Sequence, residues 1–86
     1  MKWEEIRRQY RRQWLLVEAI KAHSTAGKRI LDDLSVLATF PDSIVAMQQY
    51  TELHQQAPKR ELYVLHTDKE QLDITERHWL GIRGLS

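Results

Sequence analysis

Residues 29–40, RILDDLSVLATF, alternate between apolar and polar side chains in the way that a β-strand requires. The apolar side chains occupy even positions: Ile30, Leu34, Val36, Ala38 and Phe40. Asp32 and Leu37 interrupt the alternation, but the pattern still favours a strand over a helix. The small, turn-prone residues 24–28 precede it and include Gly27. If residues 13–23 are also a strand, the two runs predict a long β-hairpin around this turn.

Residues 13–23, QWLLVEAIKAH, are compatible with two structures. The spacing of Trp3, Ile6 and Tyr10 predicts a short amphipathic helix at the start of the chain. Trp14 and Val17 would continue that apolar stripe, so one unbroken helix over residues 3–22 is possible. A central strand buried on both faces also explains the apolar run at 14–17. Periodicity alone leaves both interpretations open.

Two later elements are better defined. Pro41 favours an extended Phe40, and Asp42 or Ser43 can cap a following helix. The apolar face expected for this helix consists of Ile44, Met47, Tyr50 or Thr51, and His54. The dipeptide at 57–58 contains a proline and ends it. Residues 61–67, ELYVLHT, are rich in β-forming side chains and predict a strand buried on both sides.

These elements predict a small α+β domain of order α-β-β-α-β over residues 1–71, with a tail at 72–86 that contains a short helical turn. We expect a three-stranded, mainly antiparallel sheet with its helices on one face; an all-α helical bundle is the structural alternative. The expected core is Trp14, Leu16, Val36, Met47, Tyr50, Leu62 and Val64. Such a sheet leaves open edges, so we also expect a homodimer that extends or covers it.

Composition narrows the class of protein. The chain has 86 residues, a formal net charge of +1 and no cysteine. The length allows one domain, and the absence of cysteine excludes disulfides, thiolate nucleophiles and cysteine-ligated metals. The first residues lack the apolar segment of a secretion signal, and the longest apolar run is far too short for a membrane span. We therefore expect a cytoplasmic protein with no membrane association.

No catalytic or metal-binding motif is visible in the sequence. None of the four histidines lies three or four residues from another, and the glycines form no phosphate-binding loop. Asp32, Asp33 and Glu18 could be considered as ligands of a divalent cation, but adjacent strand residues point to opposite faces. We therefore expect no cofactor, no metal and no enzymatic activity.

One basic cluster lies near the start of the chain. Residues 1–12 have a net charge of +3 and residues 13–86 a net charge of −2. The cluster consists of Arg7, Arg8, Arg11 and Arg12, with aromatic side chains on either side. Four engaged phosphates would give a log–log salt slope of roughly −3 to −4. The alternative is an ordinary solvated helix face. The cluster therefore makes a small nucleic-acid-binding regulator the second functional hypothesis.

The C-terminal tail supplies the first functional hypothesis. Its large apolar side chains either fold back over the sheet or dock on another protein. The residues expected to bind a partner are Trp79, Leu80, Ile82 and Arg83. An exposed tryptophan near an arginine is typical of a binding hot spot. The tail therefore indicates a non-catalytic protein-interaction module.

Four segments of the chain resemble a known kind of protein: QWLLVEAI, KRILDDLSVLATFPDS, ELYVLHT and LDITERHWLGIRG. They are similar to small uncharacterised bacterial and cyanobacterial proteins, a family of unknown function with strand–strand–helix–strand order. The resemblance implies that residues 13–23 form a strand. Relatives of this kind often have a proline after the position of Tyr10, where this chain has Arg11. Their frequent neighbour is a predicted retropepsin-like aspartyl protease, which implies an accessory or antitoxin-like role.

Overall fold

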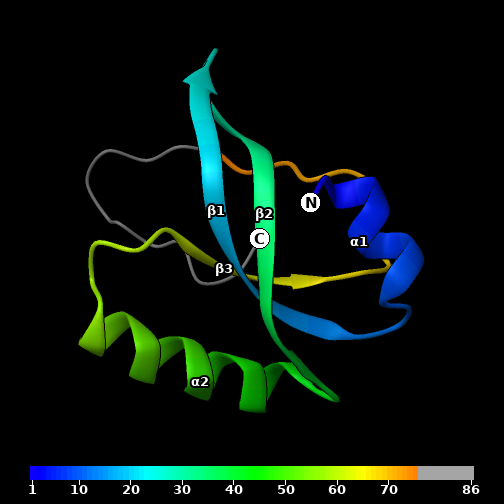
Figure 1. Cartoon of the computed structure of the whole chain (residues 1–86), viewed down its shortest axis with the longest axis vertical. Helices are drawn as coiled ribbons and strands as arrows, with labels where there is room; N and C mark the ends of the chain where they lie inside the picture. Colours follow the sequence, from blue (N-terminus) through cyan, green and yellow to red (C-terminus); the bar gives the residue numbers. More distant parts are fainter. Residues whose placement is uncertain (76–86) are drawn as a thin grey trace.

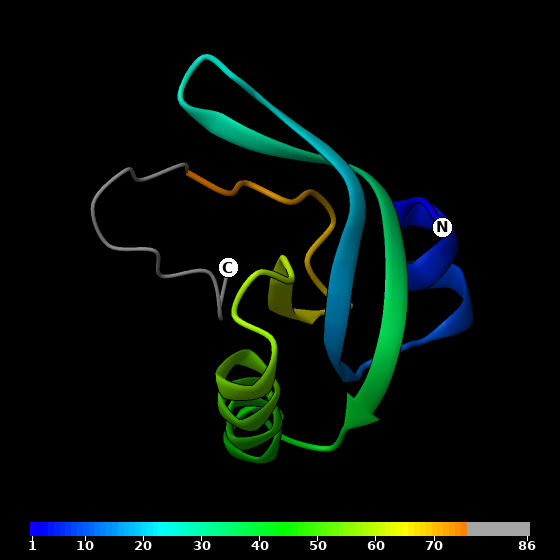
Figure 2. The same ribbon diagram turned by 60° about the vertical axis from the view of Figure 1, so that its left-hand side comes forward.

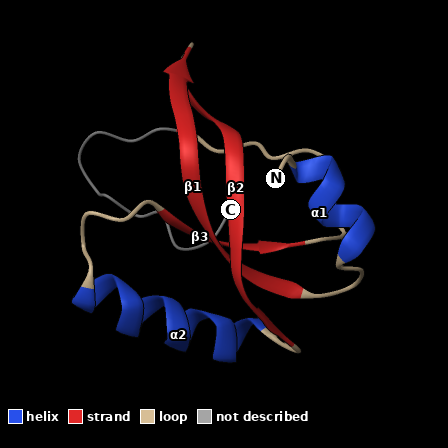
Figure 3. Cartoon of the chain, viewed as in Figure 1, coloured by secondary structure: helices blue, strands red, loops and turns tan. Residues whose placement is uncertain are grey.

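A computed structural model describes residues 1–75 of the chain, and Figures 1 and 3 show its five elements. These are α1 (Trp3–Gln9), β1 (Trp14–Thr25), β2 (Lys28–Phe40), α2 (Ser43–Gln56) and β3 (Leu62–His66). The α+β class and the order α-β-β-α-β are confirmed, and the all-helical alternative is wrong. The helix and the strand at the start of the chain are separate elements, because Arg12 adopts a left-handed backbone with φ of 54°.

The sheet is antiparallel, with strand order β2-β1-β3. β1 and β2 form the hairpin, and its two-residue loop is Ala26–Gly27. Both loop residues have positive φ, at 50° and 76°, which is the requirement of a type I′ turn. This turn matches the right-handed twist of the strands. Because β3 pairs only with residues 14–18 of β1, the hairpin continues beyond β3 as a two-stranded ribbon (Figure 1).

Irregular pairing in the hairpin occurs where the sequence pattern is interrupted. Leu16 pairs with Ala38 and Val17 with Val36, so Leu37 is an extra residue in β2. Asp32 is a second extra residue in β2, and Ile20 is one in β1. Because side chains alternate between faces, each extra residue moves the following side chains to the other face of the sheet.

Two hydrophobic clusters cover opposite faces of the sheet. The first contains Trp3, Ile6, Leu15, Val17, Leu34, Tyr63 and Leu65. The second contains Leu16, Ala46, Leu62 and Val64. α1 therefore covers one face and α2 the other (Figure 2), and the expectation that both helices share one face is wrong. The physical reason is that β1 and β3 are apolar on both faces, so each face needs a cover.

Most of the expected core is present, with one change. Leu16, Leu62 and Val64 are buried, and Trp14, Met47 and Tyr50 pack partly buried against them. Val36 instead packs against the α1 cluster, because the bulge at Leu37 reverses its direction relative to Phe40. The expected apolar face of α2 is wrong at Ile44, which is 70% exposed, because the helix contacts the sheet through Ala46 and Leu53 as well as Met47 and Tyr50.

Helix α2 begins and ends as its sequence predicts. The Asp42 side chain accepts a hydrogen bond from the Val45 N–H at 2.9 Å, which caps the first turn. The last turn closes with a bond from the Ala57 N–H to the Leu53 carbonyl.

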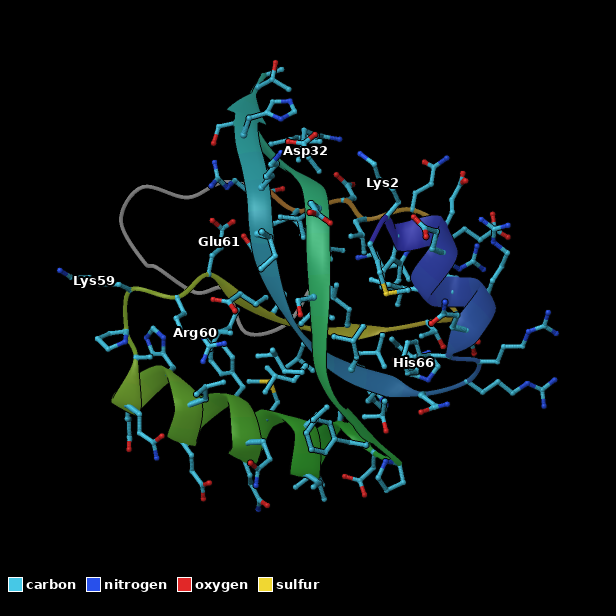
Figure 4. The ribbon with its side chains drawn as sticks, in the orientation of Figure 1. Lys2, Asp32, Lys59, Arg60, Glu61 and His66 are labelled. Carbon is cyan, nitrogen blue, oxygen red and sulfur yellow. The ribbon has the colours of Figure 1, made fainter. Side chains whose placement is uncertain are left out.

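Two arginine–glutamate pairs fasten the start of β3 to the hairpin. Arg29 donates to both carboxylate oxygens of Glu61, at 2.9 and 2.8 Å. Arg60 donates to both oxygens of Glu18, at 2.9 and 2.7 Å, and these bonds lower the pKa of Glu18. Figure 4 shows Arg60 and Glu61 next to each other at the beginning of β3. Bidentate pairs of this kind fix geometry as well as adding energy.

The carboxylates considered as cation ligands have separate partners. Glu18 binds Arg60, Asp32 contacts the His23 ring at 2.6 Å, and Asp33 binds the amino group of Met1. Within residues 1–75, no group of three or more potential ligands is suited to hold a metal ion.

Residues 72–75 lie next to the beginning of β2, at residues 28–29. Leu72 and Ile74 pack partly buried against the α1 cluster. The Arg29 N–H donates to the Ile74 carbonyl at 2.9 Å, and Lys28 forms an isolated bridge with Thr75. The start of the tail is therefore tied to the hairpin.

Candidate anion-binding site

The four arginines singled out in the sequence surround one hollow beside α1. The hollow has a volume of about 600 Å³ and is lined by Glu4, Arg7, Arg8, Arg11, Arg12, Thr67 and Asp68. We call it the arginine hollow. Four positive and two negative side chains give its lining a net charge of +2. A surface of this sign and shape is suited to an anion.

The floor of the arginine hollow is the turn that follows β3. The Thr67 side chain is 3% exposed, and its hydroxyl accepts a hydrogen bond from the Gln13 N–H at 3.1 Å. The Thr67 N–H donates to the Gln13 carbonyl, also at 3.1 Å. These two bonds extend the β1–β3 pairing by one step, from Trp14 and His66 to Gln13 and Thr67. The floor is therefore continuous with the sheet.

Helix α1 is attached to the same turn by two side chains. Trp3 donates from its indole N–H to the Lys69 carbonyl at 2.9 Å. Arg7 donates from Nε to the Thr67 carbonyl at 2.9 Å. Because Arg7 uses Nε for this bond, its two terminal nitrogens remain as donors toward the hollow. α1 is short, and these anchors together with buried Ile6 fix its position.

The other three arginines are exposed and have no partner within residues 1–75. The ion pairs in this part of the chain involve other cations, and Glu4 forms none with Arg8 although the two are four residues apart. Arg7 and Arg8 lie in the last turn of α1, where positive charge is favourable next to the helix dipole. That effect does not account for Arg11 and Arg12, which lie beyond the helix.

Arg12 has an uncommon backbone conformation for an arginine. Its φ of 54° is in the left-handed region, which costs a residue with a side chain about 1–2 kcal/mol. Glycine would adopt this conformation without that cost. The chain nevertheless has an arginine here, and the turn directs it to the arginine hollow. Sequence reasoning selected Arg12 by charge but had no signal for this turn.

His66 is a residue near the hollow that the sequence did not assign to it. Its ring packs edge-on against Trp14, with centroids 4.9 Å apart. Its Nδ1 accepts a hydrogen bond from the Asp68 N–H at 3.0 Å. Figure 4 shows His66 at the end of β3 that lies next to α1. The ring thus holds the turn that carries Asp68, the acidic side chain in the floor.

The second set of predicted site residues belongs to the C-terminal tail. Trp79, Leu80, Ile82 and Arg83 lie outside residues 1–75, as does most of the expected helical turn. For the part of the chain that is described, no helix has both the length and the apolar character needed to cross a bilayer.

Comparisons with known proteins identify no relative of this chain. No family model matches the chain, and no curated protein or solved structure matches it significantly. The resemblance to small uncharacterised bacterial proteins therefore stays a prediction, and so does a neighbouring protease.

Proposed function

We propose that the protein is a non-catalytic nucleic-acid-binding module that holds phosphate groups in the arginine hollow. The observation that carries the proposal is the convergence of Arg7, Arg8, Arg11 and Arg12 around one hollow. A guanidinium group matches the two oxygens of a phosphate in a bidentate bond. Four such groups along one surface are suited to successive phosphates of a chain rather than to a single small anion.

The make-up of the arginine hollow favours binding over turnover. Its lining offers cations, two carboxylates and one hydroxyl, and that hydroxyl already accepts a hydrogen bond from the backbone. Phosphate contacts carry little sequence information, so we expect weak discrimination between base sequences. The net charge of only +1 predicts modest affinity that is confined to this surface.

The test is fluorescence anisotropy with labelled single-stranded and duplex oligonucleotides over a range of salt concentrations. We expect log Kd to change with log salt with a slope of magnitude roughly 3–4 for the wild type. The double variant Arg8→Glu/Arg11→Glu should lose binding, and it leaves the structural bond of Arg7 and the turn at Arg12 intact.

The matched control is Lys21→Glu/Lys59→Glu, which changes the net charge by the same amount on exposed residues elsewhere. Lys59 points away from the body on the side opposite α1 (Figure 4). This control should retain most of the affinity. Equal loss in both double variants would mean that only net charge matters, which would contradict a specific surface. Equal binding of polyglutamate would instead favour an acidic protein segment as the ligand.

The hypothesis of a protein-interaction module with an accessory or antitoxin-like role stays a prediction. Its residues in the tail are outside the described part of the chain, so the geometry does not favour it over the arginine hollow.

A further inference from the structure

Thr67 has a buried hydroxyl group with one unused hydrogen-bonding function. The residue is 3% exposed and lines the arginine hollow. Its oxygen accepts a hydrogen bond from the Gln13 N–H, but within residues 1–75 its hydrogen has no acceptor. A hydroxyl carries one donor as well as its lone pairs, and buried polar groups are nearly always paired. A buried donor of this kind indicates that the hollow receives a ligand with an acceptor atom.

This donor lies on the same face of the sheet as α1. Tyr63 and Leu65 belong to the α1 cluster, and side chains alternate along an extended chain, so the Thr67 side chain is on the α1 face. Arg7 reaches the same residue from α1 through the bond between its Nε and the Thr67 carbonyl. Arg7 is half-buried, whereas the other three arginines of the hollow are exposed. The hollow therefore has inner donors at its floor and exposed arginines around them.

We propose that the floor of the arginine hollow is a subsite for a phosphate monoester, the terminal phosphate of a nucleic-acid strand. Such a group has three acceptor oxygens and a charge of about −1.5 to −2 at pH 7. Two oxygens would pair with the terminal nitrogens of Arg7, and the third would accept from the Thr67 hydroxyl. The net charge of +2 on the lining, with Glu4 and Asp68 counted, balances the charge of the phosphate.

The exposed arginines favour a strand end over a small phosphorylated compound. Arg8, Arg11 and Arg12 would be available to the phosphates that follow the terminal one. A phosphate inside a strand has only two free oxygens and continues in both directions, which hinders its approach to a buried floor. This assignment rests on the proposed nucleic-acid binding and adds which part of a strand the floor holds.

The test is fluorescence anisotropy on the full chain with short thymidylate strands that carry a 5′-phosphate, a 3′-phosphate or hydroxyl ends. One of the phosphorylated strands should bind at least about tenfold more tightly than the hydroxyl-ended strand, the lower range for hydrogen bonds to a charged group. A hydroxyl-ended strand that is two nucleotides longer controls for added charge and should gain much less. A strand whose terminal phosphate is a methyl ester should bind like the hydroxyl-ended strand.

Two variants of Thr67 test its hydroxyl directly. Thr67→Ser keeps the hydroxyl and should keep the preference for the phosphorylated end. Thr67→Val should bind the hydroxyl-ended strand as the wild type does and lose the preference, whereas a purely structural role would weaken both strands alike. Thr67→Val also leaves the Gln13 N–H without its acceptor. If it does not fold, the comparison of the phosphate with its methyl ester on the wild type still decides the question.

Three results would overturn the proposal, and they differ in what they leave standing. Equal binding of phosphorylated and hydroxyl-ended strands would remove the subsite and leave nucleic-acid binding intact. Absence of binding to every strand would contradict the proposed function as well. Equal affinity for thymidine 5′-monophosphate and for the phosphorylated strand would make a small phosphorylated compound the ligand.

Discussion

Replacing Arg12 by glycine should stabilise the fold and weaken anion binding at the same time. The backbone of Arg12 has φ of 54°, where a side chain costs about 1–2 kcal/mol. Glycine avoids this cost but loses about 0.5–1 kcal/mol more conformational entropy on folding. The midpoints of these ranges leave a net gain of about 0.75 kcal/mol, which raises Tm by about 3–6 °C in a domain of this size. Loss of one phosphate contact should reduce the salt slope by about 0.7–0.9.

The matched variant is Ala26→Gly, because Ala26 has φ of 50° in the hairpin loop far from the arginine hollow. It should give the same gain in stability and leave oligonucleotide binding unchanged. Urea unfolding followed by tryptophan fluorescence measures the first effect, and the anisotropy titration measures the second.

Two outcomes would contradict this prediction, one for the backbone strain at Arg12 and one for its contact with the oligonucleotide. If Ala26→Gly stabilises and Arg12→Gly destabilises the fold, the Arg12 side chain has a structural role and the strain argument for it is refuted. If both variants stabilise and both bind the oligonucleotide equally well, Arg12 is outside the binding surface.

Three further predictions concern the core, the stability of the fold at acid pH and the floor of the arginine hollow. Ile6→Ala should lower the free energy of unfolding by about 2–5 kcal/mol in a urea titration, because Ile6 is 0% exposed and attaches α1 to the sheet. The bonds from Arg60 hold the pKa of Glu18 below its ordinary value of 4.5, so their contribution is complete above that pH and is lost as pH falls through the lowered pKa. Urea midpoints measured over the acid range should therefore fall less steeply for Glu18→Gln than for the wild type. Asp68→Asn removes a negative charge from the hollow and should strengthen oligonucleotide binding by about two- to fivefold at low salt, or about 0.5–1 kcal/mol. Unchanged affinity would place Asp68 outside the contact surface.

Local sequence patterns predicted where these elements lie along the chain. They did not predict which face of the sheet each side chain occupies. The alternation in 29–40, the cap at Asp42 and the apolar strand at 61–67 each depend on neighbours within a few residues, and the structure has all three. The interruptions at Asp32 and Leu37 marked both bulges in β2. Their consequence was not visible in the sequence. Which face receives Val36 or Phe40 depends on pairing with β1, a partner distant along the chain.

For the candidate site, too, the sequence predicted the residues but not their arrangement in space. Charge in the sequence was sufficient to select Arg7, Arg8, Arg11 and Arg12. Their arrangement around one hollow requires the left-handed turn at Arg12 and the bonds of Gln13 and Arg7 to Thr67, more than fifty residues away. Neither has a signature in the local residue pattern.

The sequence by itself therefore determined β2, α2, β3 and the identity of the basic residues, because these follow from backbone preferences and short-range periodicity. It left residues 13–23, and with them the hairpin, open between a strand and a continuation of the first helix. The tertiary structure decided which face each helix covers. α2 connects two parallel strands on either side of β1, and such crossovers are almost always right-handed, so α2 has only one face available. The other face is equally apolar, and α1 buries it. That placement brings the last turn of α1 next to the end of β3 and creates the arginine hollow between them.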